Sequence, residues 1–344
     1  MTNITNFQEK YPSIDTYWRS VILFGRNVAS YKFALAKSLL DIVPIGTTEI
    51  SLEELAKPFA NNICEHLKTH PKQATSNSSQ FLDTCRKYNN SEINYDELIA
   101  TTVKKGFNNV IDAFHIVGDR ELPLSFYEKE YSSTKKKIIL TDEIFKLRDI
   151  VNYNNFMNET EARWNLVETA WDIGVSRYLL NVKYDEQNKS LFVDNQLRRK
   201  DVTSARDALN GYQKGKCFYC FDNISIEKGN ESLCDVDHFY PHTLLKATTG
   251  INLNGVWNLV LACPRCNRGT NGKFASIPEL EYLRRLHRRN EYLICSHHPL
   301  RETLISQTGQ TEEERIKFLN EIDKVACEAF HYRWKTIQIG DETF

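Results

Sequence analysis

Two Cys-x-x-Cys pairs constrain this sequence more than any other feature. Cys217 and Cys220 form the first pair, Cys263 and Cys266 form the second, and residues 221–262 lie between them. A Cys-x-x-Cys turn directs two thiolates towards one point, so two such turns complete the shell of four sulfurs that Zn2+ prefers. Four sulfur ligands leave no open coordination position, which predicts a structural zinc ion and not a catalytic one. The segment between the pairs should therefore form a loop whose two ends are held together by the metal ion.

The composition is that of a folded protein without a disulfide framework. The chain has 344 residues, of which 41% are hydrophobic and 26% charged, and its formal net charge is −1. Its nine cysteines are an odd number, which argues against a disulfide scaffold. The alternative of a redox-active pair needs a βαβ pattern that the sequence lacks. No apolar run reaches the ~18 residues of a transmembrane helix, and the N-terminus lacks a secretory signal. We therefore expect a cytoplasmic protein that does not associate with membranes.

Hydrophobic spacing predicts a mainly α-helical chain of two domains. Residues 1–200 are expected to form a mostly helical domain, in which a capping box at Ser51–Glu54 opens a helix towards His70. The histidines of this domain have no partners at ligand spacing, so we interpret them as packed or solvated. Residues 201–344 are expected to form a second domain with a small α+β module and C-terminal helices. The other expected elements are helices at 14–43, 96–114, 159–180, 278–294 and 312–334, a loop at 72–80, a hairpin at 183–193, and strands at 137–140, 234–239 and 256–262.

The segment between the two cysteine pairs carries a second motif. It contains the string DVDHFYP, which begins at Asp235, and the string WNLVLACPRCNRG, which begins at Trp257. The expected order is strand, long loop, strand, helix. With the flanking cysteine pairs, these strings resemble the HNH nuclease family, which has the ββα-metal fold. The resemblance covers residues 212–275, and it extends to the HNH domains of CRISPR effector nucleases and to zinc-bearing HNH restriction and homing enzymes.

The resemblance implies roles for five residues. His238 matches the general base that activates water, and Asp237 matches the carboxylate ligand of the catalytic cation. Asn258 matches the asparagine that braces the loop and the base histidine, and Asn267 matches a metal ligand on the helix. Lys273 matches a helix lysine near the scissile phosphate, although its spacing is shifted. Because many members have histidine where this chain has Asn267, the amide oxygen favours Mg2+ or Mn2+ as the catalytic ion.

The residue types suit phosphodiester hydrolysis, which needs an activated water and a cation on the developing charge. Histidine titrates near neutrality, and a carboxylate binds a hard cation. Successive strand residues face opposite sides, so a distortion must let Asp237 and His238 reach one phosphate. Outside this pair, we interpret Asp235 as structural or exposed and Cys234 as a buried thiol. His242 is either an auxiliary phosphate or metal contact or a histidine that only hydrogen-bonds.

Basic residues near the motif predict a nucleic-acid surface. In the helix at 278–294, leucines are expected on one face and arginines on the other, where they could neutralise backbone phosphates. The alternative is an ordinary solvated helix face. Residues 198–200 could extend the patch, and two arginines flank Asn267 where they could grip the scissile strand. The expected DNA contacts are Arg265, Arg268, Lys273, Arg284, Arg285, Arg288 and Arg289.

These features favour a metal-dependent DNA endonuclease with a structural Zn2+ and a catalytic Mg2+ or Mn2+. We expect a role in bacterial restriction or anti-phage defence, with the N-terminal domain sensing, dimerising or docking a partner such as an ATPase. Two alternatives stay open for the biological role: a non-catalytic zinc module that binds nucleic acid or a protein, and a mobile-element homing nuclease. RNA is not excluded as the substrate. A double-strand break by one HNH module would need a dimer or two visits.

Overall fold

The structure is a computed structural model that divides into two compact units, residues 12–174 and residues 175–344, which are described separately. It describes residues 13–24, 29–75, 78–118, 120–132, 135–172, 180–195, 198–246, 251–296 and 298–344, without the side chains of 194, 195, 198–201, 245 and 246. Helices predominate over small sheets in these residues, which confirms the predicted mainly α class. The units meet in the sequence near residue 174 and not near residue 200, because the predicted hairpin pairs with the strand at 198–204, which packs with the helix at 205–213 of the second unit.

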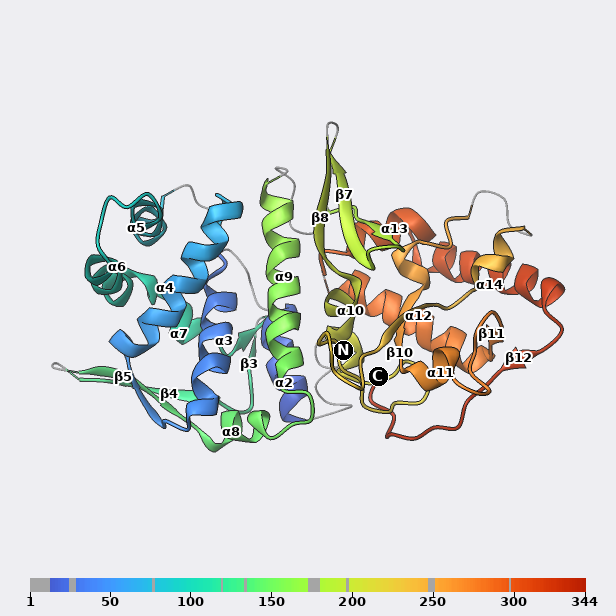
Figure 1. Cartoon of the computed structure of the whole chain (residues 1–344), viewed down its shortest axis with the longest axis horizontal. Coiled ribbons are helices and arrows are strands. Elements are labelled where there is room, and N and C mark those ends of the chain that lie inside the picture. The colour runs from blue at the N-terminus through green and yellow to red at the C-terminus, as the bar shows by residue number, and fades with distance from the viewer. Residues whose placement is uncertain are drawn as a thin grey trace. The chain divides into compact units, whose positions relative to one another are not determined.

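The N-terminal unit consists of helices and a three-stranded antiparallel sheet. Helix α3 packs against both α4 and α9, and Figure 1 shows these three helices as the body of the unit. The sheet has the strand order β1-β5-β4. The helices are α2 (Ile14–Phe24), α3 (Tyr31–Ile42), α4 (Leu52–Thr69), α5 (Gln80–Asn89), α6 (Tyr95–Thr101), α7 (Val110–Ala113), α8 (Asp142–Arg148) and α9 (Asn154–Asp172), with the short turns η1 (Val43–Ile45) and η2 (Thr102–Gly106). The strands are β1 (Glu49–Ser51), β2 (Ile116–Val117), β3 (Arg120–Glu121), β4 (Tyr127–Tyr131) and β5 (Lys136–Leu140).

Local signals placed several of these elements correctly. The Ser51 hydroxyl accepts from the Glu54 backbone N–H at 3.2 Å, and the Glu54 carboxylate accepts from the Ser51 N–H at 2.8 Å. This is the predicted capping box, and it opens α4. The predicted helix at 96–114 is interrupted by a turn of π-helix, and Asn109 has a left-handed φ of 67° that breaks it again. Strand β5 confirms the predicted strand, whereas its neighbour β4 was missed.

The C-terminal unit has two small antiparallel sheets, one parallel strand pair and a set of C-terminal helices. The hairpin β6–β7 continues into β8, and β9 pairs with β10. Trp334 belongs to a strand parallel to β11 and not to the predicted last helix, which ends at Ala329. The strands are β6 (Lys183–Asp185), β7 (Ser190–Asn195), β8 (Arg198–Ser204), β9 (Asp235–His238), β10 (Leu259–Ala262), β11 (Ile277–Pro278) and β12 (Arg333–Trp334). The helices are α10 (Ala205–Gln213), α11 (Pro264–Arg268), α12 (Leu280–Cys295), α13 (Arg301–Thr308) and α14 (Glu312–Ala329), with the short turns η3 (His242–Lys246) and η4 (Val256–Asn258).

Candidate active site and metal centre

The four cysteines of the two pairs converge on one point. All four are buried, and their sulfur atoms lie within 4.8 Å of one another. The Sγ atoms of Cys220 and Cys263 are 3.8 Å apart. This is too far for a disulfide but equals the edge of a tetrahedron with Zn–S bonds of about 2.3 Å, which is about 3.8 Å. The arrangement is compatible with the predicted zinc site.

Polar groups contact two of the four sulfur atoms. The backbone N–H of Cys263 donates to Cys217 Sγ at 3.3 Å, and Arg265 Nη2 lies 3.4 Å from Cys220 Sγ. A hydrogen bond with the Cys217 thiol lowers the pKa of Cys220 to about 7. Burial, in contrast, raises the pKa of Cys217. A metal ion binds thiolates and not thiols, so its binding would release the protons that the cluster still holds.

A strand–loop–strand–helix unit is built directly onto this cluster. Strands β9 and β10 are antiparallel, with His238 opposite Leu259 and Asp237 opposite Val260, and α11 follows β10. The Phe218 N–H between the first two cysteines donates to the carbonyl of Leu261 at 2.9 Å. The first cysteine turn is thereby attached to β10, and residues 221–262 return to the same point, as the spacing predicted.

Asp237 is buried beside two polar side chains. Its carboxylate accepts from the Tyr219 hydroxyl at 2.6 Å and lies 3.3 Å from Lys273 Nζ. Burial raises the pKa of Asp237, and the charge of Lys273 opposes that rise. Lys273 is completely buried and also donates to the carbonyl of His238 at 3.0 Å. The prediction that Lys273 meets a phosphate is therefore wrong for this arrangement, because its ammonium group neutralises Asp237 inside the unit.

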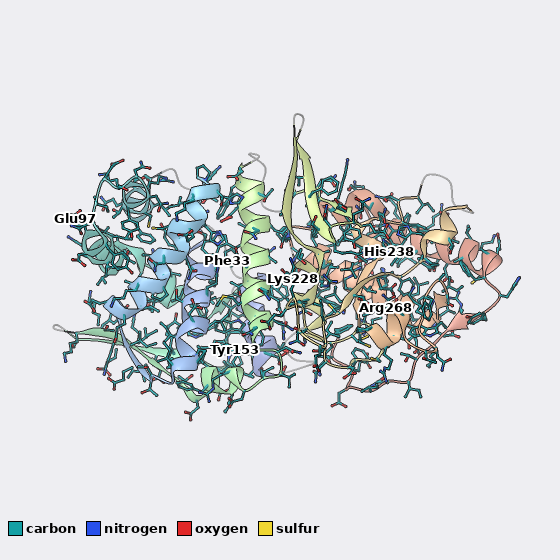
Figure 2. All side chains as sticks on the ribbon, viewed as in Figure 1. Phe33, Glu97, Tyr153, Lys228, His238 and Arg268 are labelled. Atoms are coloured by element: carbon teal, nitrogen blue, oxygen red, sulfur yellow. The ribbon has the colours of Figure 1, made fainter. Side chains whose placement is uncertain are left out.

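His238 faces the opposite side of the strand, as period two requires. Figure 2 labels His238 in the C-terminal unit. The Nε2 of His238 lies 2.9 Å from Asn254 Oδ1, and its ring centroid is 4.1 Å from that of His242. Burial, and then the neighbouring His242, lower the pKa of His238 to about 3. The imidazole is therefore neutral at pH 7 and keeps one nitrogen lone pair.

Asn258 braces the loop between the two strands. Its Oδ1 accepts from the Tyr240 N–H at 2.8 Å, and its Nδ2 donates to the carbonyls of Tyr240 and Leu253 at 2.9 and 2.8 Å. These bonds tie the chain after His238 to the residue before Asn254, which is the partner of His238. The loop-bracing function implied for Asn258 thus has a direct geometric basis, and its action on His238 is indirect.

Asn267 pairs with Asp235 and not with Asp237. Its Nδ2 donates to Asp235 Oδ2 at 3.1 Å, and Arg268 Nε donates to the same oxygen at 2.8 Å. Asp235 therefore has the structural role that the sequence predicted for it. The two predicted ligands of the catalytic cation, Asp237 and Asn267, are each held by other partners. Mg2+ or Mn2+ does not fit this arrangement, because a cation at Asp237 would have to displace the Lys273 ammonium group.

The predicted basic face of α12 is smaller than expected. Arg284 and Arg288 are exposed, and Arg288 lies 3.6 Å from Glu342. Arg289 is buried and donates to the carbonyls of Val256 and Trp257 at 3.3 and 3.1 Å. The prediction that Arg289 lies on the solvent face was wrong. Arg289 is three residues after Leu286 and four before Leu293, so it lies on the same face of the helix as these leucines.

Arg285 is also turned inwards. Its guanidinium donates to the carbonyls of Phe218 and Tyr219 and lies 4.1 Å above the ring of Phe221. It therefore secures the first cysteine turn and does not belong to an exposed patch. Arg265 and Arg268 remain exposed next to Asn267. The side chains of residues 198–200 lie outside the described residues.

Three residues near the site were not found from the sequence. Tyr219 lies between the cysteines of the first pair, Asn254 lies in the loop between β9 and β10, and Glu186 lies in the turn of the β6–β7 hairpin. Only Tyr219 had a local signal, because the zinc turn fixes its neighbours. The sheet brings Glu186 close to His242, with Glu186 Oε2 3.2 Å from His242 Nε2. No local sequence pattern predicts that contact.

Comparisons with family models, with curated proteins and with solved structures find no match for this chain. None of the helices in the described part of the chain has the length and apolar character of a membrane span.

Proposed function

We propose that the C-terminal unit is a metal-dependent endonuclease that hydrolyses phosphodiester bonds in DNA. The observation that carries this proposal is the placement of His238 at the end of β9, in a strand–loop–strand–helix unit attached to four converging thiols. Zinc would be held by these four cysteines and would supply structural rigidity, because four sulfur ligands leave no position for substrate.

His238 is the residue that activates the attacking water. It is largely buried at the end of a strand, its ring is neutral, and Asn254 orients it through Nε2. Asn258 holds the loop that carries Asn254. We derive no step through a cation at Asp237 and Asn267, because Lys273 already neutralises Asp237 and Asn267 is bonded to Asp235.

The exposed arginines supply a candidate surface for the DNA backbone. Arg265 and Arg268 lie on the helix that follows β10, and Arg284 and Arg288 lie on α12. Guanidinium groups bind phosphates without regard to sequence, which gives a salt-sensitive affinity. A role in restriction or anti-phage defence, and a partner such as an ATPase or a second copy of the chain, are part of the same proposal.

A non-catalytic zinc module that binds nucleic acid is the alternative function. The observation that favours it is the engagement of Asp237 by Lys273 and Tyr219, which leaves the implied cation site unassembled. The two functions differ in what they require of His238, because a binding module does not need an imidazole at that position.

A nicking assay tests the proposal. Supercoiled plasmid and a labelled RNA are incubated with the purified protein in Mg2+, in Mn2+ and in EDTA. The variant His238→Ala is compared with His331→Ala, a histidine that is exposed. We expect metal-dependent nicking of DNA that falls at least about 100-fold in His238→Ala, the size of a lost proton-transfer group, and that is unchanged in His331→Ala. DNA binding without cleavage in any metal would favour the binding module, cleavage of RNA alone would change the substrate, and equal cleavage by both variants would remove His238 from the mechanism.

A further inference from the structure

The turn of the β6–β7 hairpin brings an acidic side chain to the two histidines of the β9 motif. Glu186 lies in that turn, His238 ends β9, and His242 begins η3. Each residue offers one ligand atom, and the three atoms lie within 4.8 Å of one another. In the described part of the chain, the four cysteines are the other group of this kind.

The distances in this cluster suit a shared ion. His242 Nε2 is 3.2 Å from Glu186 Oε2, yet it is shielded from solvent and makes no hydrogen bond to any described residue. A tetrahedral ion with bonds of about 2.0–2.1 Å has ligand atoms about 3.3 Å apart. The two atoms are therefore spaced as ligands of one ion and are not aligned as a hydrogen-bonded pair.

The surroundings orient two of the three ligands. Asn254 Oδ1 accepts from His238 Nε2, which leaves the lone pair on Nδ1. A second hydrogen bond on the far ring nitrogen is the usual device that fixes a metal-binding histidine. Beside Glu186, the Asp185 carboxylate accepts from the N–H groups of Gln187 and Asn188 at 2.8 and 3.1 Å, which fixes the turn.

We propose that Glu186, His238 and His242 bind one divalent transition-metal ion. Two imidazoles and one carboxylate suit Mn2+, Fe2+ or Zn2+ and not Mg2+, which prefers oxygen ligands. Three protein ligands leave positions open for water and a phosphate oxygen. This deepens the proposed function, on which its catalytic meaning rests. His238 would act by holding the ion, because Nδ1 cannot both bind metal and take a proton, and the ion would lower the pKa of a bound water.

Metal binding, measured without reference to cleavage, tests this site. The full chain, carrying zinc on its cysteines, is titrated with Mn2+ while the free ion is followed by electron paramagnetic resonance. We expect the wild type to bind one Mn2+, and Glu186→Gln and His242→Asn to bind it at least about tenfold more weakly, a loss that even outer-sphere partners cause. The matched controls are Glu231→Gln and His331→Asn, because both residues are exposed in the same unit.

The outcomes separate this inference from the proposed function. Glu186 is 47% exposed, so Glu186→Gln should keep its zinc and its melting temperature, which excludes misfolding as the cause of lost binding. Equal Mn2+ affinity in the wild type and both ligand variants, or no binding by the wild type, would overturn the site even if the protein cleaves DNA. Binding that depends on Glu186 and His242 in a protein that cleaves neither DNA nor RNA would support the site and overturn the endonuclease.

Discussion

Each unit of this protein contains two histidines four residues apart beside a glutamate, and the pKa of one buried histidine in each pair is shifted, upwards for His66 and downwards for His238. In the N-terminal unit the pair is His66 and His70, with Glu168 between them. In the C-terminal unit the pair is His238 and His242, with Glu186. The difference lies in how many carboxylates each buried imidazole contacts.

The N-terminal pair is a structural ion network. His66 contacts Glu168 through Nδ1 and Glu161 through Nε2 at 3.3 Å, and Trp164 stacks on its ring at a centroid distance of 3.5 Å. Burial alone would lower the pKa of His66, but the hydrogen bonds and charges of the two glutamates raise it. Glu168 also receives the side-chain amide of Gln73 at 2.8 Å. The buried charges are thus paired within the unit.

The C-terminal pair lacks this compensation. Its buried imidazole, His238, has an amide oxygen and a second imidazole as neighbours, and its pKa falls to about 3. A buried histidine bonded to carboxylates is a cation that stabilises the fold. A buried histidine without them keeps a lone pair for a metal ion or a proton. The two buried histidines therefore differ in their contacts: His66 is paired with two carboxylates, whereas His238 contacts an amide oxygen and a second imidazole.

Removing a zinc ligand should produce the largest effect. We expect Cys263→Ser to lose zinc and to unfold the C-terminal unit, because structural zinc contributes about 10–16 kcal/mol in small zinc domains. The N-terminal unit, whose charges are paired internally, should keep its structure. Metal analysis and hydrogen exchange resolved by segment measure both effects. Cys295→Ser is the control because Cys295 is exposed, and a zinc-free Cys263→Ser protein with a protected β10 would contradict the prediction.

Replacing the glutamate of each pair by glutamine should affect the stability of the protein very differently in the two cases. Glu168 is fully buried, so Glu168→Gln should lower the free energy of unfolding by about 3–5 kcal/mol, the cost of breaking a buried ion pair. Glu186 is 47% exposed, so Glu186→Gln should change the free energy of unfolding by no more than about 0.5 kcal/mol. Urea unfolding of both variants makes the measurement. Similar losses in the two would abolish the distinction between the pairs.

The N-terminal pair should also show a pH dependence of stability. The folded pKa of His66 is raised above its unfolded value, so its contribution is complete below about pH 6.5 and is lost as pH rises through the folded pKa. We expect the protection of α4 and α9 from hydrogen exchange to fall from pH 6 to pH 9, after correction for intrinsic exchange. In His66→Gln the fall should disappear, and a wild-type stability that rises with pH over this range would show that His66 is neutral in the fold.

The smallest expected effect concerns the exposed arginines of α12. Arg284→Ala should leave the melting temperature unchanged and reduce the slope of log K for DNA against log salt by about 1, the value for one phosphate contact. Fluorescence anisotropy with a labelled duplex at several salt concentrations gives the slope. The control is Arg86→Ala, which removes an exposed arginine of the N-terminal unit. An unchanged slope in Arg284→Ala would show that Arg284 contacts no phosphate and that this face of α12 is an ordinary solvated surface.

The sequence by itself determined the features that depend on neighbours along the chain. The capping box at Ser51 formed because its hydrogen bonds join residues three apart. The four cysteines converged because each Cys-x-x-Cys turn presents two sulfurs together. The order of β9, β10 and α11 followed the alternation and spacing of the motif, whereas the loop brace at Asn258 had been implied only by the resemblance to a known family.

Only the tertiary structure decided which polar groups meet. Lys273 neutralises Asp237, Arg289 is buried against backbone carbonyls, and Glu186 reaches His242 from a hairpin earlier in the chain. The environment of His66 likewise depends on glutamates of α9, far along the sequence. The protonation and ligand capacity of a buried side chain depend on desolvation and on the charges around it, and these are set by packing between distant segments.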